Sequence, residues 1–120
     1  MGIIAKIAIG IIAIEHIYIL WLEMFAWTTR AKKVFPLPKD LFEPTKTMAA
    51  NQGLYNGFLA AGLIWSLLIS NVEWSQNIAL FFLGCVLVAG IYGGVSVTKR
   101  IFMVQGIPAL LAILAVLFLR

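Results

Sequence analysis

The sequence predicts an all-α fold, a polytopic four-helix up-down bundle embedded in a membrane. Hydrophobic residues make up 62% of the 120 residues, charged residues make up 12%, and the mean hydropathy is +1.01. A soluble globular chain is about half apolar and about a quarter charged, so this composition indicates a membrane protein. The length fits a single domain, residues 1–120, and the lone Cys85 excludes a disulfide scaffold.

Four stretches are long and apolar enough to cross a bilayer, which takes about 20 residues of helix. Each must be helical, because backbone groups without partners in hydrocarbon are very unfavourable. The first stretch is longer than the apolar part of a signal peptide and has no small-residue cleavage site, so we expect it to be retained. The expected spans are residues 3–26, 49–69, 78–97 and 101–119.

The connections between the spans predict the orientation of the chain. Residues 27–48 and 98–100 together hold seven Lys or Arg residues, whereas the amino end, residues 70–77 and the carboxyl end share two. Basic loops stay on the cytoplasmic side of a membrane. We therefore expect both basic loops in the cytoplasm and both termini outside. The net charge of +4 follows from this topology and from attraction to anionic lipid, so no nucleic-acid partner is expected.

Small residues on two spans predict close helix packing. Gly53, Gly57 and Ala61 recur every four residues on the second span, and a similar stripe runs through residues 89–97 of the third. Such stripes let membrane helices approach closely, within one chain or between subunits. Because four short helices leave stripes of this kind uncovered, we expect a homodimer or homotrimer.

The fourth span contains two residues that disturb a regular α-helix. Gly106 weakens the helix, and Pro108 removes a backbone N–H from the ladder of hydrogen bonds. We therefore expect a kink near Gln105.

Ionisable residues occur inside the first span. Such groups cost roughly 2.5–3.5 kcal/mol at the centre of a membrane and mark function by default. Glu15 and His16 lie near the middle of the span, and Glu23 lies near its end. On a helix with 100° per residue, His16 and Glu23 share one face, whereas Glu15 points about 80–100° away from it. We expect that face to turn inward, with Glu15 on its shoulder.

Polar side chains on two other spans lie at the same end of the bundle as Glu23. The second span opens with amides and a tyrosine, and Gln105 enters the fourth span near its cytoplasmic end. We expect these groups to form one layer, with His16 and Glu15 deeper, and to bind the head of an amphipathic small molecule or lipid. The alternative is a set of hydrogen bonds that only holds the helices together. The candidate ligand-binding residues are Glu15, His16, Glu23, Asn51, Gln52, Tyr55, Asn56 and Gln105.

Metal and nucleophile chemistry find little support in the sequence. His16 and Glu23 are two helical turns apart, about 10 Å along the axis, and no second His exists. We therefore expect no metal and no cofactor. No pairing of a nucleophile with a base is visible, and Cys85 beside Gly84 is expected to pack. The sequence names no catalytic residue and leaves open whether the protein is an enzyme.

One polar string gives the chain a family resemblance. The string Asn51-Gln52-Gly53-Leu54-Tyr55-Asn56-Gly57, together with residues 22–27 and 105–109, resembles a family of small four-span bacterial membrane proteins. That family is known only as domain of unknown function 1304. The resemblance covers essentially the whole chain and implies a multi-pass protein of the bacterial cytoplasmic (inner) membrane, with no established activity.

Two further resemblances concern the overall plan. The polar start of the second span is similar to that of the membrane-associated eicosanoid and glutathione metabolism (MAPEG-like) proteins, four-span trimers that bind glutathione between subunits. Their motif has a Glu where Leu54 and Tyr55 stand here. The chain also resembles the small multidrug exporters in plan, and Glu15 matches their proton-exchanging Glu. The resemblance to the exporters implies one alternative to a ligand-binding bundle, a proton-coupled exporter using Glu15. A structural or accessory membrane subunit, whose polar layer only specifies assembly, is a further alternative.

Overall fold

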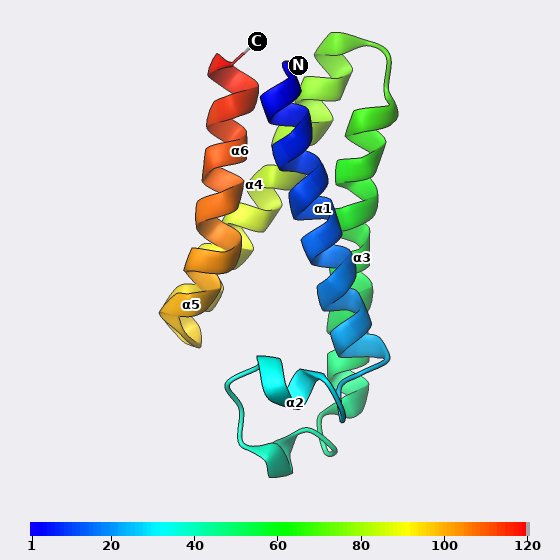
Figure 1. Ribbon diagram of the computed structural model, residues 1–120, viewed down its shortest axis with the longest axis vertical. Helices are drawn as coiled ribbons and strands as arrows, with labels where there is room; N and C mark the ends of the chain where they lie inside the picture. Colours follow the sequence, from blue (N-terminus) through cyan, green and yellow to red (C-terminus); the bar gives the residue numbers. More distant parts are fainter. Residues whose placement is uncertain (120) are drawn as a thin grey trace.

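The computed structural model describes residues 1–119, and in them four long helices form an up-down bundle. The first three are α1 (Ile3–Met24), α3 (Lys46–Leu68) and α4 (Val72–Ser96). The fourth combines α5 (Lys99–Ile101), the π-helical turn η2 (Phe102–Gly106) and α6 (Ile107–Phe118). Both termini and the α3–α4 connection lie at one end of the bundle, and α2 and the α4–α5 turn lie at the other (Figure 1). The predicted all-α bundle is confirmed.

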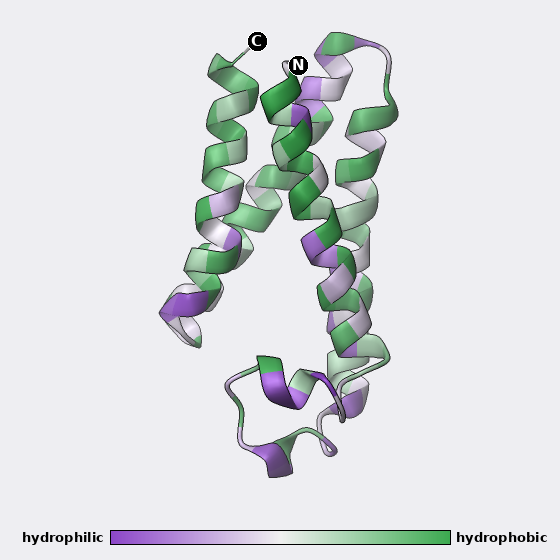
Figure 2. Ribbon diagram, viewed as in Figure 1, coloured by the Kyte–Doolittle hydropathy of each residue, from purple (hydrophilic) through white to green (hydrophobic). Residues whose placement is uncertain are grey.

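The long helices have the composition of membrane spans. Helices α1 and α4 and the segment Lys99–Phe118 are long and apolar enough to cross a bilayer. Large apolar side chains cover their outer faces, with Ile14 68% and Phe81 65% exposed, and Figure 2 shows this hydrophobic covering along the bundle. The chain is therefore a multi-pass membrane protein. Helix α3 has 23 residues but a more polar first half, so its crossing stays a prediction.

Helix α4 extends beyond the expected span because its start is capped. It begins at Val72 instead of residue 78, and the Asn71 side chain accepts a hydrogen bond of 3.0 Å from the Trp74 N–H. A side-chain acceptor of this kind satisfies one of the free N–H groups of a first helical turn. The additional first turns are polar, so the apolar part of α4 still starts near residue 78.

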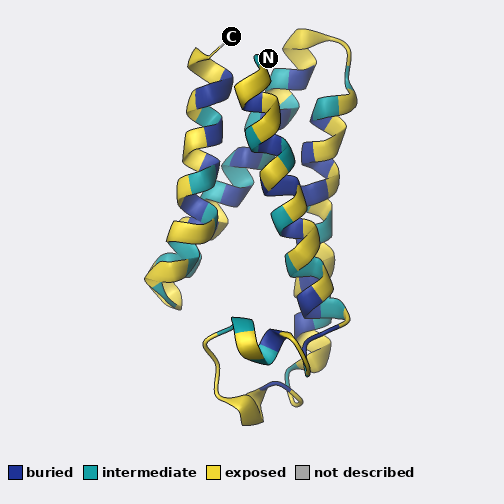
Figure 3. Ribbon diagram, in the orientation of Figure 1, coloured by how far each residue is buried: buried dark blue, intermediate teal, exposed yellow. Residues whose placement is uncertain are grey.

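All four long helices share one apolar core in the half of the bundle that contains the termini. Small side chains predominate in this core, which lets the helices lie close together. Figure 3 shows the buried positions facing one another across the helices. The buried members are Ala5, Ile9, Ile12, Ala13, Leu63, Ala79, Leu83, Val86, Ala109, Ala112, Ala115 and Val116.

Beyond this core the helices continue as two pairs, which diverge in Figure 1. In the α1–α3 pair, a Cβ added at Gly53 would lie 2.6 Å from Met24 Cγ. In the other pair, a Cβ added at Gly90 of α4 would lie 2.5 Å from the backbone nitrogen of Gly106. The small-residue stripes therefore allow close helix packing. The stripe of α3 packs against α1, and the stripe of α4 packs against the fourth helix.

The fourth helix departs from α-helical geometry in the region where the sequence predicts a kink. The Ile107 N–H donates to the Phe102 carbonyl, five residues earlier, which is the hydrogen bond of a π-turn. Pro108 follows at once; it has no N–H, and its ring would clash with the Val104 carbonyl in a regular α-helix. The wider turn ends at Gly106, which is buried against Gly90.

The long basic connection has a small core of its own. It contains α2 (Ala31–Val34) and the short 3₁₀ helix η1 (Lys39–Leu41). The rings of Trp27 and Phe42 pack 4.8 Å apart, and Trp27 Nε1 donates to Thr45 Oγ1 at 3.0 Å. Leu22 of α1 and Ala49 of α3 complete this cluster, so the connection is fixed to the α1–α3 pair.

Replacing Gly90 with Ala should destabilise the bundle by about 1–3 kcal/mol, the usual cost of overpacking. The new Cβ would lie 2.5 Å from Gly106 N and 2.7 Å from Gly106 Cα, backbone atoms that have little room to move. Gly84→Ala is the control, because no atom lies within 4 Å of a Cβ there. Thermal unfolding in mild detergent, followed by circular dichroism, measures both variants. Equal midpoints for the two would contradict the backbone contact.

Candidate functional site

The ionisable residues of α1 lie where the helical period predicts them. His16 and Glu23 are on the inward face, with 0% and 7% of their surfaces exposed, and Glu15 is half-buried beside His16. Together with Lys6 they interrupt a mainly apolar helix, and Figure 2 shows hydrophilic positions on α1. Each of these three residues has different surroundings.

Glu23 is paired with Asn56 of α3. The Asn56 Nδ2 donates to Glu23 Oε1 at 2.6 Å and to the Gln52 carbonyl at 3.2 Å, and Asn56 is 7% exposed. The local sequence makes this contact possible, because Gly53 lies one turn before Asn56 on the same face. A Cβ at Gly53 would lie 3.0 Å from Glu23 Cβ, so the glycine lets α3 approach the carboxylate.

His16 is paired with Gln105 of the π-turn. The Nδ1 atom of His16 lies 2.8 Å from the Ile12 carbonyl, which can only accept, so Nδ1 carries the ring proton. In the neutral ring, Nε2 is then an acceptor, and Gln105 Nε2 lies 3.3 Å from it. The amide of Gln105 therefore donates to His16. Sequence reasoning missed the role of Ile12, which the i−4 spacing from His16 could have indicated.

Glu15 differs from its neighbours because part of its carboxylate has no partner. Within residues 1–119, its Oε1 atom is buried and accepts no hydrogen bond. A buried acceptor without a donor costs free energy, and such groups need an explanation where they occur. A bound group with an N–H or O–H would supply the missing donor.

The predicted polar layer is divided in the structure. Gln105 contacts His16 and does not lie at the level of Glu23. The reason is that the π-turn presents Gln105 to the middle of α1. Three further candidates lie on the exposed side of α3, namely Asn51, Gln52 and Tyr55. Tyr55 is 60% exposed, and its ring packs against Phe58 with centroids 5.8 Å apart. The roles of all eight candidates in ligand binding stay predictions.

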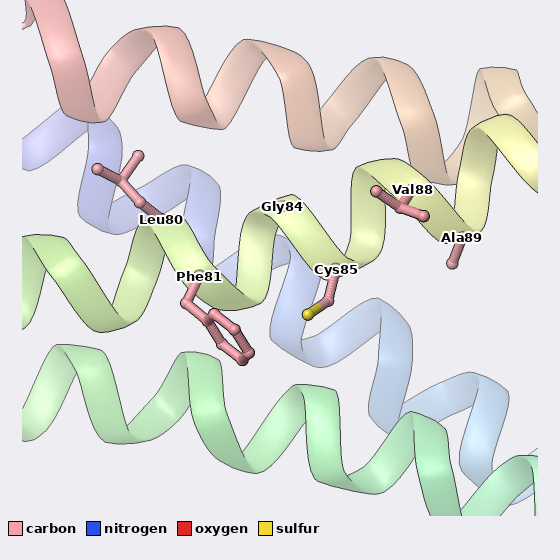
Figure 4. A pocket seen from close by; sticks show the side chains of 6 residues that line it. All are labelled: Leu80, Phe81, Gly84, Cys85, Val88 and Ala89. Carbon is pink, nitrogen blue, oxygen red and sulfur yellow. The ribbon is translucent and has the colours of Figure 1, made fainter.

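The described residues also form two apolar grooves away from the polar residues. The first runs along the outer face of α4 and is lined by Leu80, Phe81, Gly84, Cys85, Val88 and Ala89 (Figure 4). The second lies between the end of α4 and the start of the fourth helix. Neither contains an acidic residue or a histidine. Among residues 1–119, no group of three or more His, Cys, Asp or Glu side chains is placed to hold a metal ion.

Comparison with known proteins identifies relatives of the whole bundle. The model of the family described as "Protein of unknown function (DUF1304)" matches residues 10–117. The "Uncharacterized protein YpaA" of Lactococcus lactis subsp. lactis (strain IL1403) is 33% identical over 121 residues, covering 98% of this chain and 100% of that protein. No solved structure matches the chain significantly.

Replacing Asn56 with Ala should destabilise the protein by about 1–3 kcal/mol, because Glu23 would be left buried without its donor. Asn51→Ala removes the same side chain from an exposed position on the same helix and should change stability by no more than about 0.5 kcal/mol. Unfolding in detergent at a fixed protein concentration compares them. Similar losses for both would mean that the Asn56–Glu23 hydrogen bond does not stabilise the α1–α3 pair.

Proposed function

The chain belongs to the DUF1304 family, and from this membership and the geometry of α1 we propose that it binds an amphipathic small molecule or a lipid through the polar residues of that helix. The observation that carries the proposal is the buried Glu15 Oε1 atom without a hydrogen-bond donor. Residues that only hold helices together satisfy one another, as Glu23 and Asn56 do. Glu15 instead offers an acceptor to a molecule from outside the chain.

The surroundings of Glu15 indicate that the ligand has an apolar part. Ile11 and Tyr18, which are one turn away from Glu15 on the same side of α1, are 60% and 42% exposed. A molecule that approaches this carboxylate from the bilayer therefore passes along apolar side chains before its head reaches a polar group. An amphipathic molecule has this combination of properties, with its tail along α1 and its head at Glu15.

The same observation favours a second candidate function, proton-coupled export. A carboxylate halfway along a spanning helix can exchange a proton for a ligand, as the plan shared with small exporters implies. The two functions differ in one measurable respect, because the exporter releases a proton from Glu15 when the ligand binds. A structural subunit would neither bind a ligand nor release a proton, and its polar residues would serve assembly alone.

Native mass spectrometry of the protein in mild detergent, followed by extraction of bound molecules, tests ligand binding. We expect a stoichiometric small molecule or a specific lipid on the wild type and its loss in Glu15→Gln, which keeps the shape of the side chain but removes its ability to ionise. Glu73→Gln is the matched control, since Glu73 is exposed in the first turn of α4 and should have no effect on binding.

The outcome of that experiment separates the candidates. A ligand equally abundant in both variants would place binding elsewhere on the molecule. An empty wild type whose oligomeric state changes in the Glu15 variant would indicate an assembly role. The same spectra test the homodimer or homotrimer that we propose.

We also propose that the end with the two basic connections faces the cytoplasm of a bacterial cell and that both termini face outside. The two connections lie at the same end of the bundle (Figure 1), which supports this orientation under the rule for basic loops. The relative in Lactococcus lactis supports a bacterial cytoplasmic membrane.

Labelling of single cysteines in intact cells tests the orientation. In a Cys85→Ala background, a membrane-impermeant maleimide should label Asn77→Cys at once and Lys33→Cys only after the cells are permeabilised. Both positions are exposed, so access to the reagent alone decides the result. The reverse pattern would place the basic end outside the cell.

A further inference from the structure

We infer that the His16–Gln105 hydrogen bond is a latch that holds the two helix pairs together beyond their shared core and closes access to the buried His16. The inference does not rest on the proposed ligand, because the His16 ring and the Gln105 amide form this hydrogen bond without Glu15 or a bound molecule. Three features of the described residues lead to this inference: the extent of the core, the packing inside each pair, and the position of His16.

The shared core ends next to the latch. On α1 its last buried member is Ala13, and His16 lies one turn further along the helix. Beyond this level the buried residues of α1 pack within their own pair: Glu23 bonds to Asn56, and Leu22 belongs to the cluster around Trp27. The α1–α3 pair therefore does not need the other pair to bury its side chains there.

The second pair is equally complete by itself. Besides the contact between Gly90 and Gly106, a Cβ added at Gly93 would lie 2.6 Å from Ile101 Cγ2, and one at Gly94 would lie 2.6 Å from Phe102 Cβ. Helix α4 and the start of the fourth helix thus fit together closely. Among the described residues between the core and the basic connections, the one side-chain hydrogen bond between the two pairs is that of His16 with Gln105. The other side-chain hydrogen bond between the pairs, from Ser75 Oγ to the Ser66 carbonyl, lies at the opposite end of the bundle.

The latch is weaker than the bonds within a pair. Its N···N distance is 3.3 Å, whereas the Asn56–Glu23 bond measures 2.6 Å and involves a carboxyl group. Hydrogen bonds weaken as the distance grows beyond about 3.2 Å, and those to charged groups are stronger than neutral ones. The contact between the pairs is therefore expected to break while each pair stays intact.

We expect opening of the latch to expose mainly the side chain of His16. His16 has 0% of its surface exposed and uses both ring nitrogens. Removal of the Gln105 amide frees Nε2, the nitrogen that faces the other pair. Since His16 is the one histidine of the sequence, any reaction of a histidine reports on this position alone.

Diethylpyrocarbonate, a small uncharged reagent that modifies neutral imidazole, tests the latch in the purified full-length protein. We expect Gln105→Ala to be modified at His16 roughly tenfold faster than wild type, as for loss of one hydrogen bond from the closed state. Val104→Ala, an exposed position in the same π-turn, should react at the wild-type rate. Equal rates for Gln105→Ala and wild type would overturn the inference.

Distances between spin labels show whether the helix pairs separate. In a Cys85→Ala background, labels at Phe25→Cys, directly after α1, and at Val95→Cys on α4 report on the distance between the pairs, both positions being at least 73% exposed. Gln105→Ala should broaden and lengthen this distance. Labels at Phe25→Cys and Met48→Cys, both on the α1–α3 pair, should keep theirs, which also shows that the variant is folded. Faster modification of His16 without a change in the first distance would overturn the latch between pairs.

Discussion

A polar side chain inside a membrane must find its partner within the protein, and this constraint determines which helices of the bundle meet. Helix α1 carries the ionisable residues, so the other helices bring their donors to it. Asn56 comes from α3 to Glu23, and Gln105 comes from the π-turn to His16. At Glu23, Gly53 lets the backbones of α3 and α1 come close enough. Gly90 acts on Gln105 indirectly, because it brings α4 against the backbone of Gln105 and Gly106. The small residues and the polar residues thus act together, because each hydrogen bond depends on a close approach beside it.

Much of the architecture follows from patterns that the membrane imposes on a sequence. The lengths of the apolar stretches predict four helices, and the 100° period predicts that His16 and Glu23 share the buried face of α1. The π-turn follows from Gly106 and Pro108. These properties are local, since they depend on residues within one or two turns of each other, and they agree with the structure.

The arrangement of the site was harder to predict, because it depends on contacts between distant parts of the chain. The position of Gln105 in the sequence is compatible with a contact to Glu23 or to His16. Which of the two residues Gln105 contacts depends on how the fourth helix crosses α4 at Gly90. The pattern of residue types in the sequence does not predict how these two helices cross. Trp27 and Phe42 give a similar lesson, because their packing against Leu22 and Ala49 forms a cluster from four segments. The unpartnered oxygen of Glu15 likewise becomes visible only when the neighbours of that side chain are placed.

The basic connection between α1 and α3 is fixed to one helix pair, and this has an electrostatic consequence. Its lysines and arginine belong to the α1–α3 pair, whereas Lys99 and Arg100 lie at the tip of the other pair. Two positively charged tips at the same end of a membrane protein repel each other, over a range of about 8–10 Å at physiological salt. Anionic lipid headgroups between the tips would neutralise that repulsion. Under the proposed orientation, the lipid composition of the cytoplasmic leaflet would then contribute to how closely the two halves of the bundle lie together.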